Sequence, residues 1–306
     1  MAATAVVRRG TGRSGFHASQ VRAGLVFILP YVIYFLVMQA GALAFAFWIS
    51  LHRWDLLALE NPFRGLENYT NLPENENFVI ALRNTAFYAV VVTIFQTMFA
   101  LVMAVLLNAK IRGSAFFRST WYTPSVASTV VISIIFLWIY HPTGLLNSII
   151  SAVTGTQFQF TWLQDTRTAL PAIMGLNIWT TAPTFMIVFL AGLQDIPRSV
   201  YEAAEVDGAG PLRRFFSITI PLLRPIIFLV VALGIIGTFQ VFDQIQIMTT
   251  GGPLKSTLTV AFLIYQDVFK DQGQVGVACA MAFTLGVIIY VLTIVSRRYL
   301  DAKIDY

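Results

Sequence analysis

Long apolar stretches without Asp, Glu, Lys or Arg constrain this chain more than any other feature. Thirty such residues, 23–52, separate Arg22 from Arg53, and another 26 lie between Arg83 and Lys110. A helix needs about 20 apolar residues to cross the hydrocarbon core of a bilayer. Only 11% of all residues are charged, whereas soluble domains carry about 25%. The sequence therefore predicts an integral membrane protein.

Six segments are predicted to cross the membrane, and all must be helical because lipid offers the backbone no hydrogen-bond partner. They are 24–50, 85–108, 119–140, 169–193, 225–248 and 276–296. The apolar segment 257–266 is too short to cross, so we expect an amphipathic helix at the outer surface there. The first segment is about twice as long as the apolar part of a signal peptide, which favours an uncleaved anchor.

Basic residues are distributed unevenly between alternate loops. The N-terminal segment, loops 109–118 and 194–224, and the C-terminal tail hold 14 Lys and Arg, whereas loops 51–84, 141–168 and 249–275 hold 6. The positive-inside rule then places both termini in the cytoplasm. We expect a cytoplasmic segment 1–23, an all-α membrane domain 24–296 and a cytoplasmic tail 297–306. Topology explains the basic excess, so no nucleic-acid partner is expected.

The predicted spans are almost free of ionisable groups. Five of the six contain no Asp, Glu, Lys, Arg or His, and the exception is Asp243 near the outer end of the fifth. Asp243 could equally be an interfacial residue or part of a cavity. Ion-coupled transporters and pumps use such groups as relays, and the sequence shows no paired carboxylates, nucleophile–His arrangement or phosphate loop. A single cysteine, Cys279, and three scattered histidines give no disulfide framework or histidine-rich metal site. Neither an intramembrane enzyme nor ion-coupled transport is indicated, so the energy for any transport would come from elsewhere.

The loop 194–224 is the one cytoplasmic loop long enough for a function of its own. We expect Asp195 to cap a helix with Pro197 in its first turn. Gly208 and Gly210 permit a chain reversal, and Pro211 can open a second short helix. A solvated helical hairpin without further function remains the alternative.

This loop resembles a known motif. Glu202-Ala203-Ala204 is followed after three residues by Gly208, and after nine more by Ile218-Thr219-Ile220-Pro221. The pattern resembles the EAA loop of binding-protein-dependent ABC importer permeases. The order of this loop, a span and then Met248–Pro253 is similar to the carbohydrate-uptake branch of the MalF/UgpA type. The resemblance covers about residues 20 to 300. Ile220 stands where a leucine is usual, and the large periplasmic domain of the maltose subunit is absent.

The resemblance implies an ABC type I importer permease fold and a subunit of the inner membrane that is not itself an enzyme. It implies four kinds of partner: a second permease subunit (MalG/UgpE-like), two ATPase subunits, an extracytoplasmic solute-binding protein and a sugar or related polyol as substrate. ATP and magnesium would bind in the ATPase subunits, and no cofactor is expected in this chain. The residues implied in coupling to the ATPase are Tyr201, Glu202, Ala203, Ala204, Asp207, Gly208, Arg213 and Pro221.

Polar residues in three spans are candidates for a substrate cavity, because polar side chains in membrane helices tend to face the bundle interior. Together with the resemblance, they give the set Ser125, Thr129, Trp179, Thr180, Thr181, Gly234, Thr238, Gln240, Val241 and Asp243. Hydroxyl groups in membrane helices also bond their own backbone, so packing remains an alternative for each. The spans contain no Lys or Arg, which favours a neutral sugar over an anionic one.

Two further expectations concern alternatives and packing. A self-contained channel or facilitator is the alternative function, although it would leave the 194–224 loop without a partner. Gly276, Ala280 and Thr284 form a stripe of small residues in the sixth span, which allows another backbone to approach closely. Cys279 beside the stripe is expected to be a packing residue.

Overall fold

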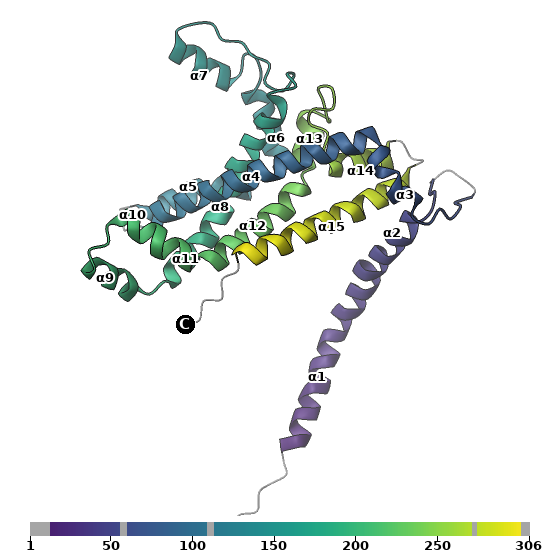
Figure 1. Cartoon of the computed structure of the whole chain (residues 1–306), viewed down its shortest axis with the longest axis horizontal. Helices are drawn as coiled ribbons and strands as arrows, with labels where there is room; N and C mark the ends of the chain where they lie inside the picture. Colours follow the sequence, from purple (N-terminus) through teal and green to yellow (C-terminus); the bar gives the residue numbers. More distant parts are fainter. Residues whose placement is uncertain (1–12, 56–59, 109–112, 271–273, 301–306) are drawn as a thin grey trace, which may run out of the picture.

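Helices make up nearly all of the regular structure in the computed structural model, which describes residues 13–55, 60–108, 113–270 and 274–300 (Figure 1). Within these ranges, the one β feature is an isolated bridge between His52 and Phe63. Five helices or helix pairs are long and apolar enough to cross a membrane: Gln20–Ser50, Glu76–Asn108, Ala169–Asp195, Arg224–Met248 and Val275–Leu300. A bent pair, Phe116–Val126 and Thr129–Ile139, would make a sixth. The predicted all-helical membrane fold is confirmed.

The first span is a single long rod set apart from the other helices. It consists of α1 (Arg13–Tyr34), the π-helical η1 (Phe35–Gly41) and α2 (Ala42–Ser50). Only α2 packs extensively against another span, α15 (Val275–Leu300). α1 points away from the bundle, and its side chains from Val21 to Tyr34 are almost all exposed (Figure 1). An exposed apolar surface of this length requires lipid or another protein surface to cover it.

The centre of the bundle is the pair α4 (Glu76–Asn108) and α8 (Ala169–Asp195). α12 (Arg224–Phe239) packs against α4 and α15. The short helix predicted over 257–266 appears as α14 (Val260–Phe269) and packs against α15 and α4. Phe262 is fully buried in the larger of two apolar cores, so α14 lies deeper than the amphipathic surface helix that we expected.

The predicted third span, 119–140, is not one helix. α5 (Ser114–Val126) and α6 (Thr129–Ile139) meet at 96°. Ala127 and Ser128 between them are extended, with ψ of 147° and 133°. Pro124 in the last turn of α5 lacks a backbone N–H and crowds the preceding turn. The corner follows three residues after this proline.

The predicted fifth span, 225–248, is also interrupted. α12 ends at Phe239, and the six-residue α13 (Asp243–Met248) begins after a break at 240–242. Phe242 leaves helical geometry, with φ of −137° and ψ of −58°. α13 packs against α6, so the two broken spans meet at their interruptions.

The remaining elements are short. α3 (Glu67–Thr70) and η2 (Leu72–Glu74) cap the end of α2, where the Asn68 side-chain amide donates to the carbonyls of Ser50 and His52. α7 (Leu145–Thr154) follows α6 and projects from the bundle (Figure 1). The 194–224 loop contains α9 (Arg198–Val206), α10 (Pro211–Arg214), the π-helical η3 (Phe215–Thr219) and α11 (Ile220–Leu222).

Candidate functional site

A polar cavity of about 140 Å³ lies at the corner between α5 and α6. α8 and α13 supply the other walls. The lining residues are Pro124, Ser125, Ala127, Thr129, Ile132, Leu176, Thr180, Thr181, Thr184 and Gln244. Four of the predicted substrate residues, Ser125, Thr129, Thr180 and Thr181, are thus brought together. The corner makes this possible, because it places Ser125 and Thr129 on two differently directed helices.

Three of the five hydroxyl groups that line this cavity, those of Ser125, Thr180 and Thr181, donate their protons to the protein. Ser125 Oγ donates to the Tyr122 carbonyl at 2.7 Å. Thr180 Oγ1 has the Leu176 and Asn177 carbonyls as acceptors at 3.1 and 3.0 Å. The oxygen lone pairs of these hydroxyls remain for a ligand, since a hydroxyl has one donor and two acceptor positions. No charged side chain lines the cavity, so it fits a neutral polar ligand.

Gly234 and Thr238 lie behind the cavity and not in its lining. Both belong to a buried polar cluster between α12 and α4, in which the hydroxyls of Thr93 and Thr238 are 3.2 Å apart. A Cβ at Gly234 would lie 2.7 Å from Gln96 Nε2. The glycine therefore makes room for the Gln96 side chain, which in turn reaches Thr181 Oγ1 at 2.7 Å.

The other four predicted substrate residues are not part of the lining. Trp179 packs its ring against Phe136 with centroids 5.6 Å apart. Val241 is buried in the apolar core. Gln240 lies exposed at the break after α12, and Asp243 is exposed at the start of α13. Asp243 therefore lies outside this cavity.

Three polar residues that contact or line the cavity were not predicted from the sequence: Gln96, Thr184 and Gln244. Gln96 lies near the middle of α4, between Thr93 and Thr97. The rule that polar side chains in membrane helices face the bundle interior would have identified it. Gln244 was hidden because the interruption at 240–242, which turns α13 toward α6, has no clear proline or glycine signal.

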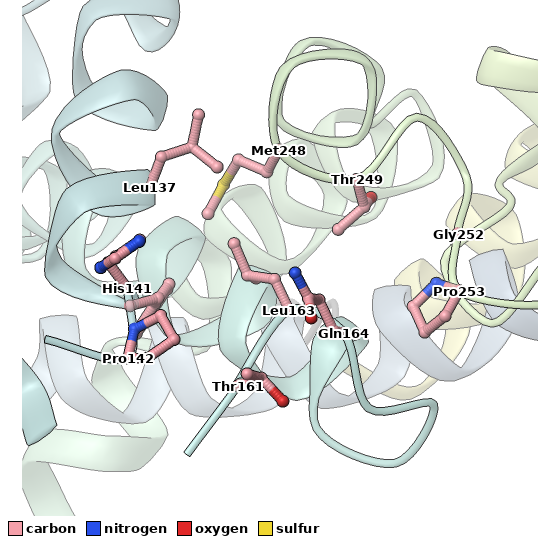
Figure 2. Close-up of a pocket in the computed structure, with 11 residues that line it drawn as sticks. Leu137, His141, Pro142, Thr161, Leu163, Gln164, Met248, Thr249, Gly252 and Pro253 are labelled. Atoms are coloured by element: carbon pink, nitrogen blue, oxygen red, sulfur yellow. The ribbon is translucent and has the colours of Figure 1, made fainter. Parts of the chain in front are cut away.

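A second cavity, of about 390 Å³, lies beyond the ends of α6 and α13. Figure 2 shows Leu137, His141, Met248 and Gln164 around one space, with Gly252 and Pro253 on its far side. Met248 follows Gln244 by four residues on α13, so the two cavities open onto the same face of one helix. The second lining also contains no Asp, Glu, Lys or Arg.

The 194–224 loop forms a helical hairpin that extends from one end of the bundle (Figure 1). α9 ends with two hydrogen bonds, from Gly208 N–H to the Glu205 carbonyl and from Ala209 N–H to the Ala204 carbonyl. These two bonds define a Schellman motif, which requires a left-handed residue at the position of Gly208. Gly208 has φ of +74°. The predicted chain reversal at this glycine is confirmed.

The side chains of the hairpin separate into an inner and an outer set. Ala204 is buried, and Tyr201 is half-buried with its hydroxyl 3.0 Å from Thr219 Oγ1. Glu202, Ala203, Asp207, Arg213 and the apolar Val206 and Leu212 are exposed, while Pro221 is half-buried at the return to the bundle. The predicted cap at Asp195 is wrong: Asp195 is the last residue of α8, and Pro197 precedes α9 without a side-chain cap. An extended Pro197 already fixes the turn between the two helices.

Comparisons with known proteins agree with this architecture. Residues 86–306 match the family model described as "Binding-protein-dependent transport system inner membrane component". The probable ABC transporter permease protein YurN of Bacillus subtilis is 32% identical over 277 residues, which are 90% of this chain and 94% of that protein. The sn-glycerol-3-phosphate transport system permease protein UgpA of Salmonella typhimurium is 29% identical over 282 residues, 91% of this chain and 92% of that protein.

A solved bacterial ABC transporter involved in import of the acidic polysaccharide alginate has the same fold. One of its chains superposes with a TM-score of 0.81 at 20% identity, covering 96% of this chain and all of that one. The matches confirm the predicted family, the importer permease fold and the inner-membrane location. The chain belongs to the family of binding-protein-dependent transport system inner membrane components, and is a permease subunit of an ABC importer.

Proposed function

We propose that this permease subunit translocates a neutral sugar or related polyol. The observation that carries the proposal is the cavity at the corner of α5 and α6. Hydroxyl groups from this bent pair and from α8 meet there, and no charged side chain lines the cavity. Sugars need hydrogen-bonding groups together with apolar walls, and Ile132 and Leu176 supply such walls. Two of the matched importers carry acidic substrates by name. A neutral lining argues for a different substrate here.

The proposed importer needs subunits that this chain lacks. A second permease would complete the translocation path, two ATPase subunits would bind ATP and magnesium, and an extracytoplasmic binding protein would deliver the sugar. Both termini and α9 would face the cytoplasm, as the basic residues indicate. The exposed apolar surface of α1 is available to lipid or to the second permease.

We propose further that α9 docks on an ATPase subunit. Its outer surface combines the carboxylate of Glu202 with the exposed apolar Val206, and the Schellman turn at Gly208 fixes its direction. ATP-driven closure of the ATPase dimer would then move α9 as a lever and open the cavity alternately to the two sides. The residues assigned to this contact are those of the EAA motif given above.

The test is purification of the tagged chain from its native membrane in detergent, followed by reconstitution into liposomes. We expect a second permease and an ATPase to co-purify. Uptake would be measured with glucose, maltose and glycerol, and with glucose 6-phosphate and sn-glycerol 3-phosphate as anionic probes. ATP-dependent uptake of a neutral probe supports the proposal, and preference for a phosphate refutes the neutral substrate. ATP-independent passage through the isolated chain would make it a facilitator.

Glu202→Lys tests the coupling assignment in the same system. We expect normal membrane insertion but loss of uptake and of binding-protein-stimulated ATPase activity. Glu74→Lys is the matched control, because Glu74 is an exposed acid in another loop. Unchanged uptake in Glu202→Lys would show that α9 does not contact the ATPase in this way.

A further inference from the structure

Gln96 is a buried amide in the middle of a membrane span. Its side chain is only 1% exposed, and it belongs to α4, which does not line the cavity. Its Nε2 has no hydrogen-bond partner among the described residues. An unsatisfied buried polar group costs about 1–3 kcal/mol. A span of this length could hold a leucine there without that cost, so the amide has to serve a purpose that an apolar side chain cannot.

Gln96 contacts the cavity through Thr181. Gln96 Oε1 accepts a hydrogen bond from Thr181 Oγ1 at 2.7 Å, and the Asn177 carbonyl is a second acceptor for the same hydroxyl, also at 2.7 Å. A threonine hydroxyl has one proton. Either of these two bonds directs that proton into the protein, so Thr181 can only accept from a ligand in the cavity.

Gly234 on α12 holds the amide in this position from the other side. A Cβ there would lie 2.7 Å from Gln96 Nε2 and 3.1 Å from Thr93 Cγ2. The glycine allows the Gln96 amide to lie between α12 and α8. The Gln96 side chain of α4 therefore contacts both α8 and α12. Its amide oxygen accepts the hydrogen bond from the Thr181 hydroxyl, which lines the cavity.

We propose that Gln96 is a positioning residue for substrate selection, which holds the Thr181 hydroxyl so that its lone pairs face the cavity. Ser125 and Thr180 donate to backbone carbonyls in the same way. Three of the cavity hydroxyls thus act as acceptors only. Acceptors at these three positions suit the O–H groups of a neutral sugar or polyol and disfavour phosphate or carboxylate oxygens, which require donors. Thr129, Thr184 and Gln244 supply the other polar groups of the lining. This inference rests on the proposed function, which it deepens.

The test is a double-mutant cycle in the reconstituted importer, with whichever of glucose, maltose or glycerol gives ATP-dependent uptake. We expect Gln96→Leu to raise the apparent KM about threefold, because the Asn177 carbonyl still accepts the Thr181 proton but the hydroxyl loses its second acceptor. Maximal uptake should change less than the KM. Thr181→Val should raise the KM further, about tenfold, because it removes the hydroxyl itself. The double variant should be no worse than Thr181→Val alone, because Gln96 acts through Thr181. A purely structural role would give additive losses.

Two further variants keep the test decisive. Thr97→Val removes the neighbouring hydroxyl of α4, which has no partner among the described residues and does not line the cavity, and it should leave the KM unchanged. Gly234→Ala should press on the Gln96 amide and raise the KM, even where Gln96→Leu fails to assemble. An unchanged KM in Gln96→Leu or Gly234→Ala, or additive losses in the cycle, would overturn the inference. Failure of the proposed function would give a different result from failure of the inference about Gln96, because the wild-type protein would then take up none of the neutral probes.

Discussion

The Tyr201 hydroxyl lies 3.0 Å from Thr219 Oγ1, and this contact joins α9 to the segment that leads back into α12. Thr219 is buried and is the last residue of the π-helical η3. The proposed movement of α9 by an ATPase would need a firm connection between this helix and the bundle. The Tyr201–Thr219 contact is the buried part of that connection, and the ion pair between Glu205 and Arg214 at 3.3 Å is a more exposed addition to it.

Removing this contact should loosen the hairpin without unfolding the protein. We expect Tyr201→Phe to reduce binding-protein-stimulated ATPase activity about threefold, because one hydrogen bond contributes about 0.5–1.5 kcal/mol. Tyr299→Phe is the control, since Tyr299 is exposed near the end of α15. Basal ATPase activity should not change in either variant. Equal stimulation in Tyr201→Phe and the wild type would show that the contact does not transmit movement.

Gly208 should be sensitive to substitution because of its backbone conformation and not because of its surroundings. Its φ of +74° disfavours any side chain, although a Cβ there would meet nothing within 4 Å. We expect Gly208→Ala to destabilise the end of α9 by about 1 kcal/mol and to lower coupled uptake. Gly210→Ala is the matched control, since Gly210 has an equally open site and φ of −66°. Hydrogen exchange at the α9 amides measures the effect, and equal protection in the two variants would contradict it.

The sequence was sufficient for the family, the helical fold and the approximate positions of the spans. Apolar length and the EAA spacing determine these features locally. It was not sufficient for the two interruptions, the corner at Ala127–Ser128 and the break at 240–242. Pro124 marks the first only as a weak point in the helix, and the contact between α6 and α13 that accompanies both interruptions joins segments distant in the chain. A window of apolar residues looks the same whether the helix continues or turns.

The candidate cavity shows the same limit. Ser125, Thr129, Thr180 and Thr181 were found because their spans carry obvious polar clusters. Thr238 was found in the same way, and Gly234 and Val241 came from the resemblance, but all three are buried outside the lining of the cavity. The face that a side chain presents depends on how the helix is rotated in the bundle, and tertiary packing determines this rotation.

Asp243 and Gln244 are sequence neighbours that should behave differently. Asp243 is exposed outside the cavity, whereas Gln244 is buried and lines it. We expect Asp243→Asn to leave the KM for the transported sugar unchanged, and Gln244→Leu to raise it by about tenfold through the loss of a polar contact. Each of the two variants serves as the control for the other. A raised KM in Asp243→Asn would show that this carboxylate takes part in the substrate path.

Gly276 is the one glycine among the three residues of the small-residue stripe, and it should not tolerate a larger side chain. A Cβ there would overlap the His52 carbonyl oxygen and lie 3.1 Å from the Trp54 backbone nitrogen. Both are backbone atoms of the segment after α2, and neither can rotate away. We expect Gly276→Ala to destabilise the protein by about 1–3 kcal/mol, because α15 would have to move off this segment. Gly286→Ala, on the same helix with nothing within 4 Å of the added Cβ, should be neutral. Thermal unfolding of the purified complex measures the difference, and equal midpoints for the two variants would show that the segment after α2 yields without cost.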